Sequence, residues 1–382
     1  MTTPTATWSY PTTIRFGPGR IAELGDACRA AGIARPLLVT DRGLASLEIT
    51  ERARALLTHD GLGDAMFAEV DPNPNELNLA AGSEAFKAGG HDGVVAFGGG
   101  SGLDLGKMVA FMAGQSRPVW DFEDLGDWWT RADADAVAPN VAVPTTAGTG
   151  SEVGRASVLT NSETHEKKII FHPKVLPSQV IADPELTLGM PAAITAGTGM
   201  DALAHCLEAY CSPHFHPMSQ GVALEGMRLV QENLRRAFTT PNDLDARAQM
   251  MAAAMMGAVG FQKGLGAIHA LSRPVGALYD THHGTTNAVV MGAVLRFNRA
   301  QIEERMDRAA AYMGLEGGYE GFVGFAAQLC ADLGIPTRLS DMGVRTDRIE
   351  TMVDMALRDP CCGGNPRPLD AASVRALFAE VI

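Results

Sequence analysis

The hydrophobic pattern of the chain changes near residue 187, and this change limits the possible folds more than any other feature. Before that point, short apolar runs of strand length alternate with stretches of helical periodicity. After Pro191 the apolar residues recur almost entirely with helical spacing. Alternating strands and helices predict a parallel sheet, whereas the second half predicts packed helices. We therefore expect an α/β domain over residues 1–187 and an all-helical domain over residues 188–382.

The predicted strands of the first half each end in small or polar residues. They lie at residues 36–40, 93–97, 141–144 and 179–182. Because ligands of open α/β sheets bind beyond the carboxyl ends of the strands, these four strand ends mark the expected cofactor site. The predicted helices of the second half lie at residues 199–210, 218–234, 246–261, 267–278, 288–313, 321–333, 345–357 and 369–380.

The predicted strand at residues 93–97 runs into the glycine-rich sequence GGGSGLDLGK. This sequence is not GxGxxG, because Leu103 stands at the last glycine position, and it is not Walker A, because Met108 replaces Ser or Thr. A strand that passes through glycines into a helix, here starting near Gly102, still presents free backbone N–H groups to a phosphate. The alternative is a tight turn without a ligand. The residues expected at the phosphate are Gly98, Gly99, Gly100 and Ser101.

A second small, polar loop, PTTAGTGSE, follows the predicted strand at residues 141–144. Alone, such a loop is also typical of a plain turn. Two such loops at neighbouring strand ends predict a nucleotide cleft. The candidate hydrogen-bond donors of this loop are Thr145, Thr146, Thr149 and Ser151.

Asp41 directly follows the predicted strand at residues 36–40. A carboxylate at a strand end accepts hydrogen bonds from the hydroxyls of an adenosine ribose and repels a 2′-phosphate. This interpretation favours NAD over NADP. The alternative is that Asp41 only serves as the N-cap of a following helix.

Four side chains of the helical half offer a metal-binding set. Asp201 and His205 are four residues apart in a predicted helix, so they share one helix face. His269 lies among small apolar residues, and His283 follows it by fourteen residues. One carboxylate and three imidazoles suit a divalent transition metal and leave room for a substrate oxygen. From spacing alone two alternatives stay open: a hydrogen bond or helix cap for the Asp/His pair, and a core position for His269.

Composition argues against several other classes of function. The net charge of −13 disfavours a nucleic-acid partner, because phosphate backbones need clustered Lys and Arg. The most apolar long run, residues 250–261, is too short to span a membrane, and the N-terminal stretch lacks the apolar core of a signal peptide. The six cysteines include no CxxC pair, which favours a reduced, cytoplasmic protein. We expect a small-molecule substrate, with neither nucleic acid nor membrane as partner.

Taken together, the motifs resemble those of the iron-containing (group III) alcohol dehydrogenase family. GGGSGLDLGK is similar to the family's GGGSxxDxxK loop, and PTTAGTGSE is nearly identical to its second loop. GMDALAHCLEAY and GAIHALSRPVGALYDTHHG resemble its metal-ligand regions, and IADPELT and GGNPRP also fit. The matches extend in order from residue 12 to residue 368.

The resemblance implies the dehydroquinate synthase-like superfamily fold: a Rossmann-like dinucleotide domain, then an all-helical metal domain, with the metal in the cleft between them. It implies reversible hydride transfer between an alcohol carbon and C4 of the nicotinamide of NAD, with Fe²⁺ as the first candidate metal and Zn²⁺ as the second. Family members mostly form homodimers or larger homo-oligomers. The implied metal ligands are Asp201, His205, His269 and His283. The implied cofactor contacts are Asp41, Asn73, Gly98, Gly99, Gly100, Ser101, Asp104, Thr145, Thr146 and Lys168.

Arg273 departs from the family pattern, because the family commonly has a second His at this position, four residues after His269. An Arg stays charged and relays no proton, but it can hold a carboxylate bidentately. The alternative is that Arg273 pairs with a nearby acid such as Asp280 and only shapes the wall of the site. For the alcohol proton the candidate is His282, beside His283, with solvent, a cofactor ribose hydroxyl or a mere packing role for His282 as alternatives.

Three other functions remain as alternatives to an alcohol dehydrogenase. A reductase of an anionic carbonyl compound, similar to maleylacetate reductase, is favoured by Arg273. A lyase similar to dehydroquinate synthase would need several Lys and Arg near the ligand helices, and only Lys263 and Arg273 lie close in the sequence. A non-catalytic protein that binds nucleotide or metal is disfavoured by the number of intact family motifs.

Overall fold

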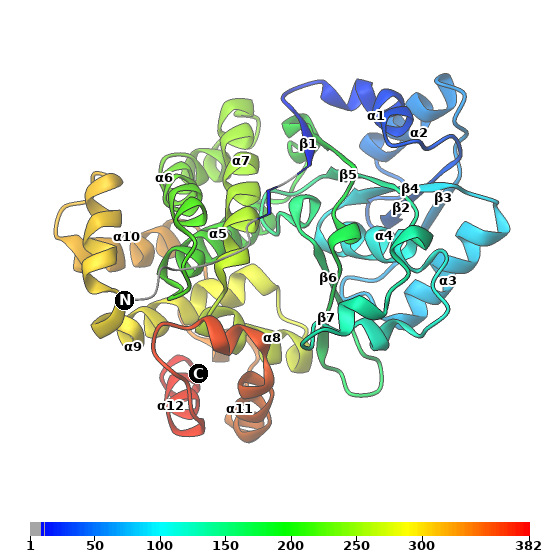
Figure 1. The fold of residues 1–382 in the computed structure, drawn as a ribbon. Helices are drawn as coiled ribbons and strands as arrows, with labels where there is room; N and C mark the ends of the chain where they lie inside the picture. Colours follow the sequence, from blue (N-terminus) through cyan, green and yellow to red (C-terminus); the bar gives the residue numbers. More distant parts are fainter. Residues whose placement is uncertain (1–8, 11) are drawn as a thin grey trace. The chain divides into compact units, whose positions relative to one another are not determined.

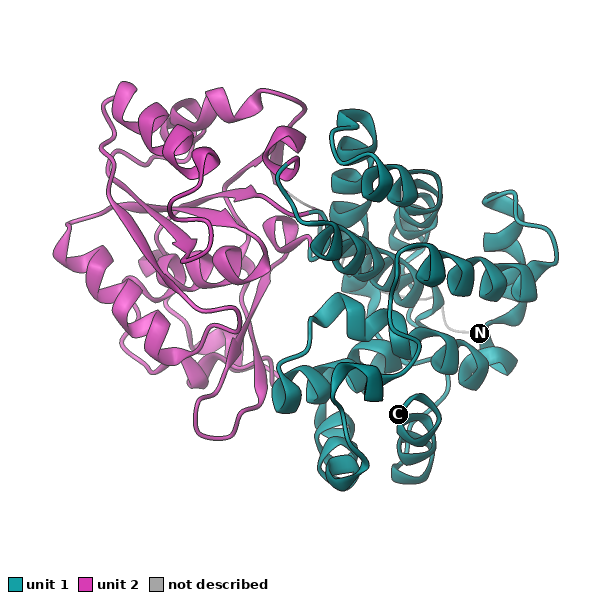
Figure 2. Ribbon diagram, turned by 180° about the vertical axis from the view of Figure 1, so that it is seen from behind, with its two compact units in different colours: residues 1–9, 147–149, 189–382 teal, residues 10–146, 150–188 magenta. Residues whose placement is uncertain are grey.

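A computed structural model describes residues 9–10 and 12–382 of the chain. The expectation about a signal peptide concerns residues 1–20, of which residues 1–8 and 11 lie outside the described residues. Within the described part of the chain, no helix has both the length and the apolar character needed to cross a membrane. Figure 2 shows that the chain forms two compact units. One contains Tyr10–Thr146 and Gly150–Leu188, and the other contains Ser9, Ala147–Thr149 and Gly189–Ile382.

The α/β unit is built on six parallel strands in the order β1-β8-β5-β4-β2-β3 (Figure 1). Strands β4 and β5 are buried along their whole length, and β2 is buried except at its last residue. Strands covered on both faces are apolar at nearly every position, which is why they appear as continuous apolar runs. The strands are β1 (Thr13–Phe16), β2 (Pro36–Asp41), β3 (Met66–Val70), β4 (Gly93–Gly98), β5 (Asn140–Pro144) and β8 (Gln179–Ala182).

Successive side chains of the central strands pack against helices on opposite faces of the sheet. Val95 and Phe97 belong to a buried cluster that includes residues of α1 and α2. Ala96, between them, lies against α4 so closely that a Cβ on Gly106 would come within 2.5 Å of the Ala96 Cβ. Figure 1 shows the helices on both sides of this sheet. They are α1 (Leu24–Ala30), α2 (Glu48–His59), α3 (Glu76–Ala88) and α4 (Gly100–Met112).

The strand order reverses between β2 and β4. The chain passes from β2 outward to β3 and then returns to β4 on the other side of β2. Such a switch point is where open α/β sheets bind ligands, outside the carboxyl ends of the strands. The two strand ends adjoin, because a Cβ on Gly98, the last residue of β4, would lie 3.5 Å from Oδ2 of Asp41.

The helical unit is organised around α5, which is buried from Thr195 to Cys211 and packs against α6, α7 and α9. Other helices can cover α5 on all sides because nearly all of its surface residues are apolar or small. The helices are α5 (Ala192–Cys211), α6 (Pro217–Thr239), α7 (Leu244–Gly260), α8 (Ala267–Tyr279), α9 (His283–Tyr312), α10 (Gly318–Asp332), α11 (Ile349–Arg358) and α12 (Ala371–Val381).

The predicted fold class is confirmed, but several elements differ from the prediction. The four predicted strands are β2, β4, β5 and β8, while the edge strands β1 and β3 and the antiparallel hairpin β6 (Ala156–Thr160) and β7 (Lys167–Phe171) were not predicted. Helix α4 begins at Gly100 instead of near Gly102, because Gly99 serves as its N-cap residue. Helix α9 begins at His283 instead of residue 288, because the His282 side chain caps it.

Candidate active site

The glycines after β4 allow the backbone to turn sharply into α4. Gly98 has a φ of 143°, a conformation that side chains with a Cβ rarely adopt. A Cβ on Gly102 would come within 2.9 Å of the carbonyl oxygen of Phe97, so the first turn of α4 packs directly on the end of β4. Gly99, the N-cap residue of α4, has no side chain that could cap the helix. Its first N–H groups, from Gly100 onward, therefore form the kind of helix end that binds a phosphate.

Two side chains next to this helix end have defined hydrogen bonds. Oδ1 of Asp41 accepts from Leu44 N at 3.0 Å, which caps the turn after β2. Its Oδ2 has no hydrogen-bond partner in the described part of the chain, and it is the oxygen that faces Gly98. Ser101 Oγ donates to the carbonyl oxygen of Pro72, 2.5 Å away, and so joins α4 to the segment that holds Asn73. Asp41 is not a helix N-cap, because α2 begins at Glu48 and its N-cap is Leu47. One Asp41 oxygen caps the turn, and the other remains for a ligand.

Replacing Asp41 by Asn is expected to shift the cofactor preference from NAD toward NADP. The Asn Oδ1 still accepts from Leu44 N, whereas the amide nitrogen accepts no ribose hydroxyl and carries no charge to repel a 2′-phosphate. Hydrogen bonds to charged groups contribute about 1.5–3 kcal/mol, so the ratio of kcat/KM for NAD to that for NADP should fall about 10- to 100-fold. Steady-state kinetics with both cofactors measures the ratio. Asp26→Asn, which removes an exposed carboxylate from α1, is the control and should leave the ratio unchanged.

The second loop, residues 144–152, is anchored to α4 by hydrogen bonds from a buried lysine. Lys107 of α4 is completely buried and donates from Nζ to the carbonyl oxygens of Ser151, 2.8 Å away, and Ala156, 2.6 Å away. Asp104 adds two more bonds to this segment, because its Oδ1 accepts from Ser151 Oγ and its Oδ2 accepts from Val158 N. Both Asp104 oxygens are thus used within the protein. This geometry favours a supporting role for Asp104 beneath the loop.

The remaining cofactor candidates are placed as follows. Thr145 is buried at the end of β5, and its N–H donates to the carbonyl oxygen of Gly98, so the two strand-end loops are linked by a backbone hydrogen bond. Thr146 lies beside Gly99, whose added Cβ would be 3.2 Å from Thr146 Cγ2. Thr149 belongs to the short segment that clusters with the helical unit. Lys168 lies on β7 and forms ion pairs with Glu123 at 3.2 Å and Glu166 at 3.5 Å.

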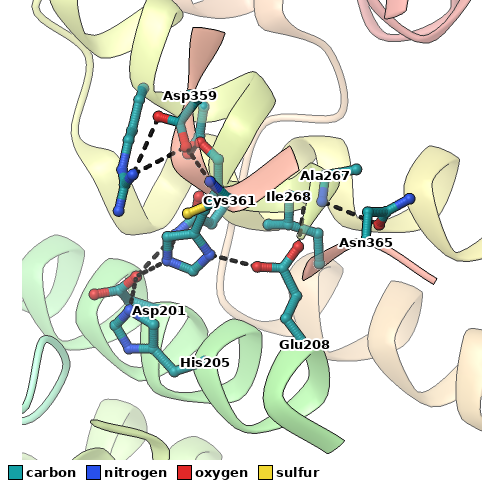
Figure 3. A network of polar contacts seen from close by, with 12 residues as sticks. Asp201, His205, Glu208, Ala267, Ile268, Asp359, Cys361 and Asn365 are labelled. Carbon is teal, nitrogen blue, oxygen red and sulfur yellow. Dashed lines mark hydrogen bonds and ion pairs between the residues drawn. The ribbon is translucent and has the colours of Figure 1, made fainter. Parts of the chain in front are cut away.

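Asp201, His205 and His269 offer ligand atoms that all lie within 4.8 Å of one another, and Figure 3 shows Asp201 beside His205. The Nε2 atoms of His205, His269 and His283 each lie 3.7 Å from Oδ1 of Asp201. Two atoms that bind one Zn²⁺ or Fe²⁺ at about 2.1 Å with a tetrahedral angle lie about 3.4 Å apart. The donor set therefore has both the chemistry and the spacing for one divalent transition metal. Asp201, His205 and His269 are buried, and His283 is partly exposed.

Burial and the neighbouring charges push the pKa values of this cluster apart. Burial lowers the pKa of His205 to about 4, although the Asp201 carboxylate opposes this change. Burial also lowers the pKa of His269, but the Glu208 and Asp201 carboxylates outweigh it and raise the value to about 9. For Asp201 itself burial raises the pKa, and the surrounding imidazoles reverse this effect and hold it far below the ordinary value. Asp201 is therefore a carboxylate at neutral pH, as metal binding requires.

Two residues of this cluster were missed by the sequence analysis. Oε2 of Glu208 lies 2.6 Å from Nδ1 of His269, the ring nitrogen opposite the one that faces Asp201. Asn287 donates from Nδ2 to Oδ1 of Asp201 at 2.8 Å. Their sequence signal is helical spacing: Glu208 follows Asp201 by seven residues on α5, and Asn287 follows His283 by four on α9.

Arg273 pairs with an acid, as the alternative interpretation expected, but the acid is Asp359 and not the suggested Asp280. Nη1 of Arg273 lies 3.0 Å and 3.1 Å from the two carboxylate oxygens of Asp359. Asp280 is the C-cap residue of α8 in a left-handed conformation, with a φ of 52°, beyond the helical turn that carries Arg273. Burial lowers the pKa of the guanidinium, but Cys361, Asp359 and Glu208 outweigh it and raise it further above its ordinary value. Nε and Nη2 of Arg273 have no hydrogen-bond partner in the described part of the chain and keep access to solvent.

His282 acts as the N-cap of α9. Its Nδ1 accepts from Thr285 N at 3.3 Å, and the side chain is exposed. A neutral ring that accepts at Nδ1 carries its proton on Nε2. Its ring packs closely on α5, since a Cβ on Gly197 would come within 2.5 Å of Nδ1. The structure thus shows a structural use of His282, and its proposed use in proton transfer stays a prediction.

Comparison with known proteins places the chain in a family. Residues 11–184 match the model described as iron-containing alcohol dehydrogenase, and residues 195–382 match the model of the C-terminal part of the Fe-containing alcohol dehydrogenase family. The chain belongs to the iron-containing alcohol dehydrogenase family. The resemblance stated from the motifs is thereby confirmed.

Individual members of this family align with nearly the whole chain. A 4-hydroxybutyrate dehydrogenase of Cupriavidus necator is 39% identical over 97% of this chain and 98% of its own length. The crystal structure of a 1,3-propanediol oxidoreductase superposes with a TM-score of 0.92 at 35% identity, covering 99% of this chain and 100% of that one. Sulfoacetaldehyde reductase from Bifidobacterium kashiwanohense, solved in complex with NAD⁺, superposes with a TM-score of 0.90 at 28% identity over 99% of both chains.

Membership confirms the predicted reaction class and cofactors. The chain is an oxidoreductase of the alcohol dehydrogenase class and depends on NAD and on iron or another divalent metal.

Proposed function

We propose that this chain interconverts a primary alcohol and its aldehyde at the cluster formed by Asp201, His205, His269 and His283. The observation that carries the proposal is the convergence of three imidazole Nε2 atoms at 3.7 Å from one carboxylate oxygen. This donor set suits Fe²⁺ and Zn²⁺, and family membership favours iron. Residues 1–187 would bind the dinucleotide and residues 188–382 the metal.

The chemistry divides between the bound groups and the side chains. When bound, the divalent metal stabilises negative charge on the alcohol oxygen and NAD accepts the hydride. Asp201 supplies the negative charge of the ligand set, and Asn287 fixes the carboxylate through its bond to Oδ1. The uncapped N-terminus of α4 and the Asp41 carboxylate would hold the phosphate and ribose of the dinucleotide. His282, next to His283 in the chain, is our candidate for passing the alcohol proton to solvent through Nε2.

The proposal is tested by metal analysis together with an activity assay. Anaerobically purified protein reconstituted with Fe²⁺ or Zn²⁺ should bind about one metal ion per chain and reduce NAD with one or more short primary alcohols. The panel should include 1,3-propanediol and 4-hydroxybutyrate, the substrates named for two relatives. Metal-loaded protein that binds NAD but oxidises no alcohol and reduces no aldehyde would refute the proposal.

A second candidate, an alcohol that carries an ionised group, is favoured by Arg273. This residue lies one helical turn after His269 on α8, and Asp359 uses only its Nη1, which leaves Nε and Nη2 available for an anion. Two relatives act on substrates of this kind, since 4-hydroxybutyrate carries a carboxylate and sulfoacetaldehyde a sulfonate. An intact metal-ligand set is compatible with both candidates.

Arg273→Gln is expected to separate the two candidates. If Arg273 holds a substrate carboxylate, kcat/KM for 4-hydroxybutyrate should fall about 10- to 100-fold, since charged hydrogen bonds contribute about 1.5–3 kcal/mol. The same variant assayed with 1,4-butanediol, a neutral diol of equal chain length, is the internal control and should change by less than about threefold. Equal decreases in kcat/KM for both substrates would mean that Arg273, paired with Asp359, only shapes the wall of the site.

We also propose a cytoplasmic homo-oligomer. All six cysteines are free, which fits a reducing compartment. Light scattering coupled to size-exclusion chromatography measures the oligomeric state, and a monomer at micromolar concentration would contradict the proposal.

A further inference from the structure

We infer that Glu208 is a positioning residue that selects the ring tautomer of His269 and fixes the helix end on which His269 lies. The inference rests on the proposed function, because it assigns His269 Nε2 to the metal. Glu208 itself does not reach the cluster of candidate ligand atoms. It contacts Nδ1, whereas the Nε2 of the His269 ring faces Asp201.

The N-terminus of α8 has no cap of its own. Its N-cap residue is Gly266, which has no side chain to accept from the first N–H groups of the helix. These groups are capped from elsewhere in the chain: Ala267 N donates to Asn365 Oδ1 at 3.1 Å, and Ile268 N donates to Glu208 Oε1 at 2.6 Å. A Cβ on Gly266 would come within 2.9 Å of Asn365 Oδ1 and 3.1 Å of Glu208 Oε1. Because Gly266 has no Cβ, the side chains of Asn365 and Glu208 have room to cap this helix end.

The second oxygen of Glu208 determines which nitrogen of His269 carries the proton. Oε2 lies 2.6 Å from Nδ1 of the ring, and both side chains are buried. A carboxylate only accepts hydrogen bonds, so Nδ1 must be the protonated nitrogen. In the neutral ring that metal binding requires, the lone pair is therefore on Nε2, which faces Asp201 Oδ1. The bond to Ile268 N and the positive end of α8 stabilise the charge of Glu208 in this buried position.

One face of α5 carries both the candidate metal ligands Asp201 and His205 and the positioning residue Glu208. Asp201, His205 and Glu208 follow one another on α5 with the spacing i, i+4 and i+7. The same helix thus presents two candidate ligands and the carboxylate that orients a third ligand on another helix. Asn365, which caps the neighbouring N–H of α8, forms no hydrogen bond with the His269 ring among the described residues. Its other bonds are to Asn298 and Arg367. Asn365 is therefore the natural comparison for a purely structural role.

Glu208→Gln changes the pattern of donors without changing the size of the side chain. The amide has one accepting oxygen, and two N–H donors, of Ile268 and His269, face it. If the oxygen accepts from Ile268 N, the amide nitrogen faces Nδ1 and favours the tautomer with the proton on Nε2, which blocks the metal. If the oxygen accepts from Nδ1, the N–H of Ile268 loses its partner and the helix end is destabilised.

The test is the dissociation constant for Zn²⁺, measured by competition with a chromophoric chelator, alongside urea unfolding of the metal-free protein. Loss of a carboxylate behind a ligating imidazole typically weakens metal binding 10- to 100-fold, and we expect this range for Glu208→Gln. Asn365→Ala should destabilise the metal-free protein while changing the Zn²⁺ dissociation constant by less than about threefold. Glu208→Asp keeps the charge but shortens the side chain, so it separates the effect of orientation from that of charge. We expect weakened Zn²⁺ binding in this variant as well. It also replaces Glu208→Gln in the test if that variant fails to fold.

The possible failures are distinguishable. Wild-type protein that binds no Zn²⁺ would overturn the metal site itself, and the role of Glu208 with it. Wild-type binding with an unchanged dissociation constant in folded Glu208→Gln or Glu208→Asp would overturn the positioning role alone. Equal weakening by Asn365→Ala would show that loss of any cap of α8 suffices, which also contradicts a specific effect on the His269 ring.

Discussion

Asp201→Asn is expected to remove most of the bound metal and to lower kcat/KM on the order of 1,000-fold. Oδ1 of Asp201 lies 3.7 Å from the Nε2 of each of the three candidate histidines. Asparagine keeps the shape of the side chain but loses the only negative charge among the four candidate ligands. Because a catalytic metal contributes several kcal/mol of transition-state stabilisation, its loss corresponds to a rate change of this size.

The measurements are metal content by mass spectrometry and kcat/KM with the best alcohol of the panel. His214→Ala is the matched control, since it removes an exposed imidazole from the same unit and should leave both quantities unchanged. Adding excess Fe²⁺ or Zn²⁺ to Asp201→Asn should restore part of the activity if the effect is on affinity. A variant that keeps both its metal and its activity would show that Asp201 is not a ligand.

The elements that the sequence predicted well are those in which local pattern and burial agree. Strands β4 and β5 are buried on both faces, so their apolar runs are continuous and recognisable. The edge strand β1 is half-exposed, and its sequence TIRF has no such run. The hairpin β6–β7 lies outside the main sheet and was also missed. A strand with an exposed face lacks the continuous apolar run by which a buried strand is recognised in the sequence.

The candidate ligands were predictable, but their supporting partners were only partly so. Asp201 and His205 share a helix face at a spacing that sequence alone reveals, and Glu208 continues the same face. The contact between Glu208 and His269 joins residues 61 positions apart, and the pair of Arg273 and Asp359 joins residues 86 apart. No local rule predicts which distant residue a buried charge meets. This is why Asp280, the nearest acid in the sequence, was the wrong partner for Arg273.

The stability of the protein is expected to fall between about pH 4.5 and pH 7 in a way that depends on Glu152. This carboxyl is 2% exposed in the loop above Lys107. Burial raises its pKa to about 7, against the smaller opposing effects of its own backbone N–H and the Lys107 cation. In the unfolded chain a glutamate has a pKa near 4.3. The folded protein therefore binds this proton more tightly than the unfolded chain does.

The sign of the effect follows from this difference. Between the two pKa values the folded state holds more protons, so the free energy of unfolding decreases as the pH rises. The contribution is fully present below about pH 4.5 and lost above about pH 7, and its size is up to about 3 kcal/mol. Glu152→Gln removes the titrating group, so its stability relative to the wild type should increase by up to about this amount between about pH 4.5 and pH 7. Urea unfolding at several pH values measures the difference, with the exposed Glu163→Gln as a charge-matched control that should show none. A stability difference for Glu152→Gln that does not vary with pH would mean that Lys107 keeps Glu152 ionised in the folded protein throughout this range.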